Sequence, residues 1–352
     1  MKFYSNKRLL YKRDLNGEEP AILICTGVRG DGKTTCWNRW LIDRAINHNE
    51  LFLCLVRIQD EMINFNHGFF ENLDSTITID RMPPLEGYKC YQQVVVPKKI
   101  YSLFLETPEG EIIKIGYVSC LKANETVKRN SNLFNDVKYI VLDEFQNEKN
   151  QYLKNEEELL TSIYVSVNRG QGTHDRGVKL ILIGNMITLL NPYYVKLKIH
   201  ERLRMNTHFL RGDGWVLEQS NNQDAREAME TNKVLKAFEN RYTRSQTEFK
   251  YLLDTYDDVK KENLKNTRYI CTIRVNDKTY GIRLHLRKMI YIVTRSTDLD
   301  QGLIYINSKD PARECELNDM SRVRLYRDMF QAGLFRFDSL ESKSALIEYL
   351  RY

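Results

Sequence analysis

A glycine-rich loop placed directly after a short apolar run constrains this chain more than any other feature. The run at residues 21–26 (AILICT) is typical of a strand that is buried on both faces of a parallel sheet. The loop at residues 27–35 (GVRGDGKTT) fits the pattern of a glycine, four residues and Gly-Lys-Ser/Thr, and residues 33–48 predict a helix. Loop amides and the positive end of a helix dipole attract anions, so the sequence predicts a phosphate-binding loop.

Individual residues of this loop have expected roles. The glycines let the backbone wrap around phosphates without a Cβ clash. Lys33 is placed to reach the β- and γ-phosphates, and the Thr34 hydroxyl to join a Mg²⁺ shell. We therefore expect ATP and Mg²⁺ to bind here, the alternative being a chance match on a glycine turn. The expected nucleotide-binding residues are Gly27, Val28, Arg29, Gly30, Asp31, Gly32, Lys33, Thr34 and Thr35.

Two carboxylates follow another apolar run. Residues 139–142 (YIVL) predict a buried strand, and Asp143 and Glu144 stand at its carboxyl end, where ligands bind in open α/β sheets. Asp143 is expected to hold Mg²⁺ opposite Thr34, and Glu144 to activate a water for attack on the γ-phosphate. A kinase needs no second acid because its nucleophile is a substrate hydroxyl, so the pair favours hydrolysis coupled to work. The alternative is an acidic pair that caps the next helix.

A polar residue at the end of a further strand completes the expected site. Residues 178–183 (VKLILI) predict a buried strand that runs into Gly184 and Asn185. The Asn185 side chain is suited to hydrogen-bond the attacking water or the γ-phosphate, although Gly-Asn is also ordinary turn chemistry. Buried strands alternate with helices in this part of the chain, which predicts an α/β fold with a mostly parallel sheet.

The sequence predicts three segments: an ATPase domain at 1–200, a linker or lid at 201–240 and a smaller α+β domain at 241–352. Within the first, residues 88–120 predict a hairpin that stands outside the main sheet. The linker is indicated by a polar stretch that contains Gly212-Asp213-Gly214. After it, the patterns predict a helix near 224–240, strands at 268–275, 279–286 and 302–307, and two helices within 319–350.

Composition excludes several classes of protein. The 352 residues include 53 Lys+Arg and 47 Asp+Glu, and no apolar run approaches the roughly 18 residues that a membrane span needs. Seven scattered cysteines without a CxxC pair predict buried, reduced thiols rather than a disulfide scaffold or zinc ribbon. Residues 260–295 contain ten Lys/Arg but only two acids, and this excess of positive charge favours a nucleic acid partner. The alternative is a strand whose charged face is simply solvated.

The phosphate loop, the acidic pair and the strand-end asparagine, in this order, resemble the additional-strand, catalytic-glutamate (ASCE) P-loop ATPases. More narrowly, nearly the whole chain resembles the genome-packaging (encapsidation) ATPases of phi29-like phages, through IVLDEF (140–145), IGNMITLLNPYY (183–194), DQGLIYIN (300–307) and GLFRFD (333–338). The resemblance implies a homomeric ring, usually a pentamer, on the portal of an empty capsid in the host cytoplasm. This ring drives double-stranded DNA inward, and family members often use a packaging RNA as a scaffold, although some relatives do without it.

The resemblance also implies roles for basic residues. In this family an arginine finger from one subunit completes the active site of its neighbour. Arg169 matches the finger by position, with Arg176 as the fallback. Either Lys128 or Arg129 matches a further basic residue that acts near the neighbouring site.

The carboxy-terminal domain is expected, from the same resemblance, to be RNase H-like without the catalytic acids of a nuclease. The strand pattern places Arg283, His285 and Arg287 on one alternating face, where a nuclease would need carboxylates. No metal-pair pattern is formed by Asp298, Asp300 and Asp310. We therefore expect this domain to grip DNA, RNA or the portal rather than to cut DNA.

Two other functions stay open at this level. One is a helicase-like or other DNA-remodelling ATPase, although no second set of buried parallel strands follows the predicted linker. The other is a nucleotide-dependent nucleic-acid-binding switch with little turnover, against which Glu144 argues. Lys149 and Arg57 are candidate DNA contacts that could instead be ordinary surface or phosphate-sensing cations.

Overall fold

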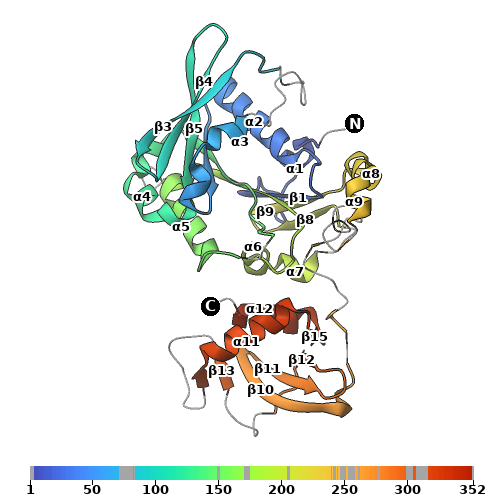
Figure 1. Cartoon of the computed structure of the whole chain (residues 1–352). Coiled ribbons are helices and arrows are strands. Elements are labelled where there is room, and N and C mark those ends of the chain that lie inside the picture. Colours follow the sequence, from blue (N-terminus) through green and yellow to red (C-terminus); the bar gives the residue numbers. More distant parts are fainter. Residues whose placement is uncertain are drawn as a thin grey trace. The chain divides into compact units, whose positions relative to one another are not determined.

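The chain forms two units, Met1–Leu252 and Leu253–Tyr352, in a computed structural model (Figure 1). The structure describes residues 4–70, 82, 84–148, 151–169, 175–203, 207–238, 240, 243, 245, 251–252, 258–260, 262–275, 278–298, 304–306 and 316–350. Within these ranges, no helix has the length and apolar character needed to cross a lipid bilayer. The six described cysteines are free thiols, five of them buried, as predicted; Cys315 lies outside the described residues.

A nine-stranded sheet organises the first unit, in the order β3-β4-β5-β2-β6-β7-β1-β9-β8. Strands β1, β2, β5, β6, β7 and β9 pair in parallel, which confirms the predicted mostly parallel sheet. The strand bounds are β1 Ile22–Gly27, β2 Leu51–Val56, β3 Lys89–Val96, β4 Ile100–Glu106, β5 Ile112–Cys120, β6 Val137–Leu142, β7 Lys179–Asn185, β8 Phe209–Gly212 and β9 Trp215–Ser220.

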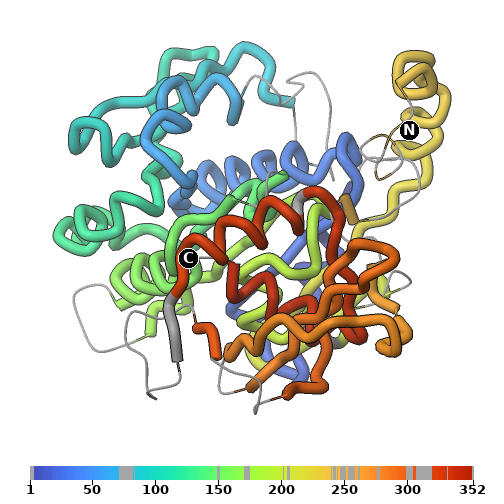
Figure 2. The backbone as a smooth tube through the Cα atoms, turned by 60° about the horizontal axis from the view of Figure 1, so that its bottom comes forward, coloured from blue at the N-terminus to red at the C-terminus, as the bar shows by residue number. Residues whose placement is uncertain are grey.

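Helices cover both faces of this sheet. The crossovers from β1 to β2 and from β6 to β7 run in opposite directions along the sheet, and right-handed connections then put their helices on opposite faces. Figures 1 and 2 show α2 (Lys33–His48) against one face and α5 (Glu156–Arg169) against the other. The remaining helices of this unit are α1 Lys7–Leu10, α3 Phe65–Phe70, α4 Asn124–Arg129, α6 Pro192–Lys196, α7 Ile199–Arg202, α8 Gln223–Thr231 and α9 Lys233–Ala237.

The predicted hairpin at 88–120 is part of the main sheet, not outside it. Strand β5 runs parallel to β2, with Phe52 opposite Gly116 and Val56 opposite Cys120. The second half of β5 is buried, so its apolar side chains contribute to the core of the unit. Gly116 permits this close pairing, because a Cβ there would lie 2.3 Å from the carbonyl oxygen of Phe52.

The predicted linker at 201–240 is wrong for residues 209–220. Strands β8 and β9 form an antiparallel hairpin, Gly212-Asp213-Gly214 lies at its turn, and β9 pairs in parallel with β1. Polar residues of β9 are buried because side chains distant in sequence satisfy them: Tyr4 donates to Glu218 at 2.8 Å, and Tyr251 donates to Gln219 at 2.8 Å. The first unit ends only at Leu252.

The second unit contains a mixed sheet in the order β14-β13-β10-β11-β12-β15. One face of this sheet packs on two helices, through a core that includes Ile273, Ile282, Val323, Phe337 and Leu346. This arrangement confirms the predicted α+β class. The element bounds are β10 Thr267–Val275, β11 Lys278–His285, β12 Ile290–Thr294, β13 Ile304–Ile306, β14 Glu316–Asn318, β15 Phe335–Phe337, α11 Met320–Gln331 and α12 Leu340–Leu350.

Candidate nucleotide-binding and catalytic site

The phosphate loop joins β1 to α2 as predicted. Gly30 and Gly32 have φ values of 78° and 87°, which side chains other than glycine rarely adopt. Gly32 precedes the first turn of α2, and no side chain caps that turn. A Cβ on Gly27 would lie 2.8 Å from the carbonyl oxygen of Ser220, so this position also requires glycine. The loop therefore has the backbone of an anion cradle at the start of a 16-residue helix.

The cations of this loop are both paired with acids. Lys33 is buried, and its Nζ donates to the carbonyl oxygen of Val28 and to Asp31 Oδ1, each at 2.8 Å. Arg29 is exposed and lies 3.1 Å from Glu148. Of the two pairs, only the first is shielded from solvent.

Thr34 and Asp143 face each other between α2 and the end of β6. Their oxygens Oγ1 and Oδ1 lie 3.4 Å apart, and Thr35, the next residue of α2, is half-buried. Burial raises the pKa of Asp143 to about 6, a penalty on its charged form that a cation at the same place would relieve. A hydroxyl and a carboxylate oxygen are donors that Mg²⁺ prefers. The residues present therefore fit the predicted metal role of Thr34 and Asp143.

Glu144 follows with an exposed side chain on an unusual backbone. Its φ is 54°, in the left-handed region that non-glycine residues rarely occupy, and such conformations persist where the surroundings enforce them. Its amide donates to Asp143 Oδ1 at 2.8 Å, and the next amide, of Phe145, donates to the carbonyl of Ile183 in β7 at 3.1 Å. This turn presents the carboxylate of Glu144 away from the core.

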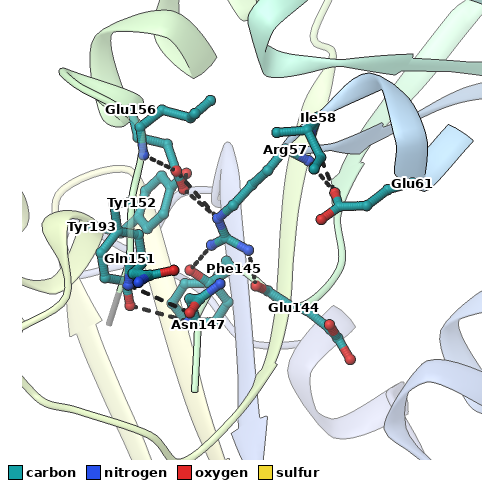
Figure 3. A network of polar contacts seen from close by, with 11 residues as sticks. Arg57, Ile58, Glu61, Glu144, Phe145, Asn147, Gln151, Tyr152, Glu156 and Tyr193 are labelled. Carbon is teal, nitrogen blue, oxygen red and sulfur yellow. Dashed lines mark hydrogen bonds and ion pairs between the residues drawn. The ribbon is translucent and has the colours of Figure 1, made fainter. Parts of the chain in front are cut away.

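Arg57 enforces that turn from the end of β2 (Figure 3). Its Nη1 donates to the carbonyl of Glu144 at 2.7 Å and its Nη2 to that of Phe145 at 2.6 Å. Its Nε lies 3.2 Å from both carboxylate oxygens of Glu156, and Glu156 Oε1 also accepts from the Tyr193 hydroxyl at 2.8 Å. Arg57 is 9% exposed with its donors occupied, so it is not the DNA contact considered above. Sequence reasoning missed Glu156 and Tyr193, because their partners are distant in the chain.

Asn185 lies at the same edge of the sheet. It ends β7 directly beside Gly27 of β1, and the next amide, of Met186, donates to the carbonyl of Gly27 at 3.2 Å. Gln146, also missed from sequence, ties the turn that contains Glu144 to this strand end: its Oε1 accepts from the amides of Ile187 and Thr188 at 3.1 and 2.9 Å. The phosphate loop, the acidic pair and Asn185 thus meet at one edge.

Arg169 is not part of this edge in its own subunit. It is exposed at the last position of α5, whereas Glu156, which Arg57 links to the turn of Glu144, is at the first. Thirteen residues of α-helix span about 20 Å, so α5 points Arg169 away from Glu144.

The fallback finger Arg176 has a structural role instead. Its Nη1 donates to the carbonyls of Phe134 and Val167 at 3.1 and 2.7 Å, and its Nη2 donates to those of Asn135 and Val137. This clamp joins the end of α5 to the segment that follows α4.

Lys128 and Arg129 are the last two residues of α4. Lys128 pairs with Glu125 at 2.9 Å, and Arg129 is exposed. Lys149 lies outside the described residues.

The second unit does not form the predicted basic face. His285 is buried, the Arg283 guanidinium lies 5.1 Å from the ring centroid of Tyr269, and Arg287 follows the end of β11. Arg283 and His285 alternate as predicted within β11, but the strand ends at His285, so Arg287 lies in the turn that follows. Within the described ranges no cluster of three His, Cys, Asp or Glu side chains could hold a metal ion. Asp298 is described, whereas Asp300 and Asp310 lie outside the described residues.

Comparisons with known proteins agree with this architecture. The chain is similar to the Phi-28 gp11 DNA packaging motor, with 19% identity, a TM-score of 0.62 and coverage of 99% of this chain and 98% of that chain. It is also similar to the bacteriophage Phi-29 viral genome packaging motor assembly, with 20% identity, a TM-score of 0.59 and coverage of 98% and 96%. At these identities the likeness shows a common fold. No curated protein matches the chain.

A match to a protein family is more specific. Residues 114–352, more than half of the chain, match the family described as Podovirus DNA encapsidation protein (Gp16). The matched range includes Asp143, Glu144, Arg169, Asn185 and the whole second unit, and it begins after the phosphate loop. The chain therefore belongs to the podovirus DNA encapsidation protein (Gp16) family.

Proposed function

We propose that this chain is the ATP-hydrolysing subunit of a motor that moves double-stranded DNA into a preformed capsid through its portal. The observation that carries the proposal is the meeting of Thr34 with Asp143 at 3.4 Å, with Glu144 presented on the adjoining turn. A phosphate loop alone would suit many nucleotide-binding proteins. A water-activating acid beside it favours ATP hydrolysis. Membership of the encapsidation family indicates that this hydrolysis is coupled to DNA packaging.

The residues at the sheet edge divide the chemistry. Loop amides and Lys33 bind the phosphates, Glu144 accepts a proton from the attacking water, and Asn185 orients that water or the γ-phosphate. Thr34 and Asp143 would hold Mg²⁺, which when bound neutralises charge on the phosphates. Arg57 keeps the peptide of Glu144 in place without facing the nucleotide itself.

The position of Arg169 favours a site completed by a second subunit. An arginine finger stabilises charge on the transferring phosphoryl group, and Arg169 is directed away from the catalytic turn of its own chain. We propose that it acts in a neighbouring subunit of a homomeric ring, which is a pentamer on the capsid. Lys128 or Arg129, at the end of α4, would assist it there.

The second unit would contribute to holding nucleic acid or the portal. A motor must grip any sequence, so the contacts would be made to phosphates and weaken as salt rises. A packaging RNA is a further possible partner of the basic residues at 260–295. Part of that charge is neutralised inside the unit, because Lys278 lies 3.0 Å from Glu341 and Lys288 lies 2.6 Å from Glu262.

A reconstituted packaging assay tests this function. Purified protein, empty capsids, linear double-stranded DNA and ATP are combined, and DNA inside capsids is scored by its protection from nuclease. We expect protection with ATP and none with Glu144→Gln, while Glu109→Gln, at an exposed position of the turn between β4 and β5, serves as the matched control. Failure to release inorganic phosphate in the complete mixture would refute the proposal.

A further inference from the structure

An acidic residue of the phosphate loop forms an ion pair with the lysine that is expected to bind the phosphates of the nucleotide. Asp31 is 2% exposed, and its Oδ1 accepts from the Nζ of Lys33 at 2.8 Å and from the backbone amide of Lys33 at 3.2 Å. Lys33 is 4% exposed, so water screens this pair very little. Without nucleotide, the buried positive charge of the loop is therefore held by a carboxylate of the same loop.

The second oxygen of this carboxylate is poorly satisfied. Asp31 Oδ2 is buried and has no hydrogen-bond partner among the described residues. It lies 2.5 Å from where a Cβ on Gly27 would stand, so it faces the first glycine of the loop. A buried carboxylate with one unpaired oxygen depends strongly on its remaining partner. For Asp31 the charged partner is Lys33.

The backbone of Asp31 is fixed from the other side. Its carbonyl accepts from the amide of Tyr4 at 3.1 Å, and the Tyr4 hydroxyl donates to the buried carboxylate of Glu218 in β9 at 2.8 Å. The amino-terminal segment therefore holds Asp31 against the sheet. The carboxylate consequently stays beside the loop when Lys33 turns toward another anion.

We propose that Asp31 sets the nucleotide affinity of this site by competing with the phosphates for Lys33. The inference rests on the proposed function, since it takes ATP and ADP as the ligands. When nucleotide binds, Lys33 turns to the phosphates and leaves a buried negative charge beside a negatively charged ligand, which raises the free energy of the bound state. When phosphate has left, Asp31 recaptures Lys33 and promotes the release of ADP.

Substitution of Asp31 by asparagine tests the competition with little change of shape. Asparagine can still accept from the backbone amide of Lys33 but carries no charge. Using the fluorescent analogue mant-ADP with Mg²⁺ and the full-length chain, we expect Asp31→Asn to bind at least about tenfold more tightly than wild type, the factor that 1.4 kcal/mol gives. Most of the change should be a slower dissociation rate, measured by stopped-flow chase with unlabelled ADP.

Asp136→Asn is the matched control, because Asp136 is an exposed aspartate next to the opposite end of β6 from Asp143. It makes the same change in net charge and should leave mant-ADP affinity unaltered. Asp31→Ser also removes the charge, and it provides a second variant if circular dichroism shows that Asp31→Asn does not fold. Unchanged or weaker binding by the folded Asp31 variants would overturn the competition alone. Absence of mant-ADP binding by wild type would overturn the proposed function as well.

Discussion

Arg57 and Glu156 form an ion pair that is almost entirely buried, with the Nε of Arg57 3.2 Å from each carboxylate oxygen of Glu156. The two residues are 99 positions apart and come from the end of β2 and the start of α5. The pair leaves the other two guanidinium nitrogens of Arg57 free to bind the carbonyls of Glu144 and Phe145. The backbone conformation of Glu144 therefore depends on an ion pair between two other elements.

Replacing Arg57 should damage both stability and turnover. Arg57→Ala leaves the charge of Glu156 buried and unpaired, which costs about 3–5 kcal/mol. Arg57→Lys keeps the charge, but its single ammonium nitrogen cannot reach the three groups that Nε, Nη1 and Nη2 of Arg57 bind, so we expect a smaller loss of stability with a clear loss of phosphate release. Denaturant unfolding and phosphate release measure the two effects. Arg211→Ala, at an exposed position of β8, is the control. Wild-type turnover in folded Arg57→Lys would contradict the positioning role.

Glu144→Gln separates nucleotide binding from hydrolysis. The substitution keeps the size and exposed position of the side chain but removes its ability to accept a proton, so phosphate release should fall by about 10²–10⁴-fold. Mant-ADP affinity should stay within a factor of two or so, since Glu144 is not expected to bind the phosphates. Retained turnover would show that another group activates the water.

Mixed subunits test where Arg169 acts. Lys33→Ala should abolish nucleotide binding and Arg169→Ala should abolish turnover, so each variant alone should be inactive. In mixed rings, a subunit with an intact phosphate loop receives Arg169 from a Lys33→Ala neighbour, and part of the phosphate release should return. The measurement is steady-state phosphate release against mixing ratio, at a concentration where rings form. Activity that never exceeds the sum of the two pure variants would place Arg169 outside a shared site.

Local sequence patterns were sufficient to predict the residues of the candidate site at the edge of the sheet, but not the side chains that hold those residues in place. Apolar runs, the glycine loop and the strand-end acids are contiguous in sequence, and α2 and β2 begin and end where the patterns predict. The role of Arg57 depends on Glu156, and periodicity carries no information about that pairing. One part of the supporting structure could have been predicted from the sequence. Asn191-Pro192 marks the start of a helix, since Asn191 caps α6 and proline occupies its first position.

The missed hairpin β8–β9 has a similar cause. Strand β9 contains Glu218 and Gln219 at fully buried positions, and polar residues in a strand normally indicate exposure to water. Tyr4 and Tyr251 make their burial possible, but neither partner is near them in the sequence. The single helix predicted near 224–240 is likewise divided, because the Asn232 side chain accepts from two amides and starts α9.

The buried acid of β9 gives a pH-dependent prediction. Burial raises the pKa of Glu218 above its ordinary value, and the carboxylate faces the Tyr4 hydroxyl at 2.8 Å and His208 at 3.7 Å. In the unfolded chain the group ionises near pH 4.3, at about its reference pKa. The folded protein therefore binds more protons above that pH, and the free energy of unfolding falls as pH rises through the folded pKa.

Glu218→Gln should remove that fall, because the amide stays neutral while it still accepts from Tyr4. The variant should gain stability relative to wild type as pH rises from about 4.3, and the difference should level off above the folded pKa. Thermal melting of the full-length proteins across this range measures the difference. Glu230→Gln, at an exposed position of α8, should show no such trend. A difference between Glu218→Gln and wild type that is constant with pH would mean that Glu218 ionises equally in both states.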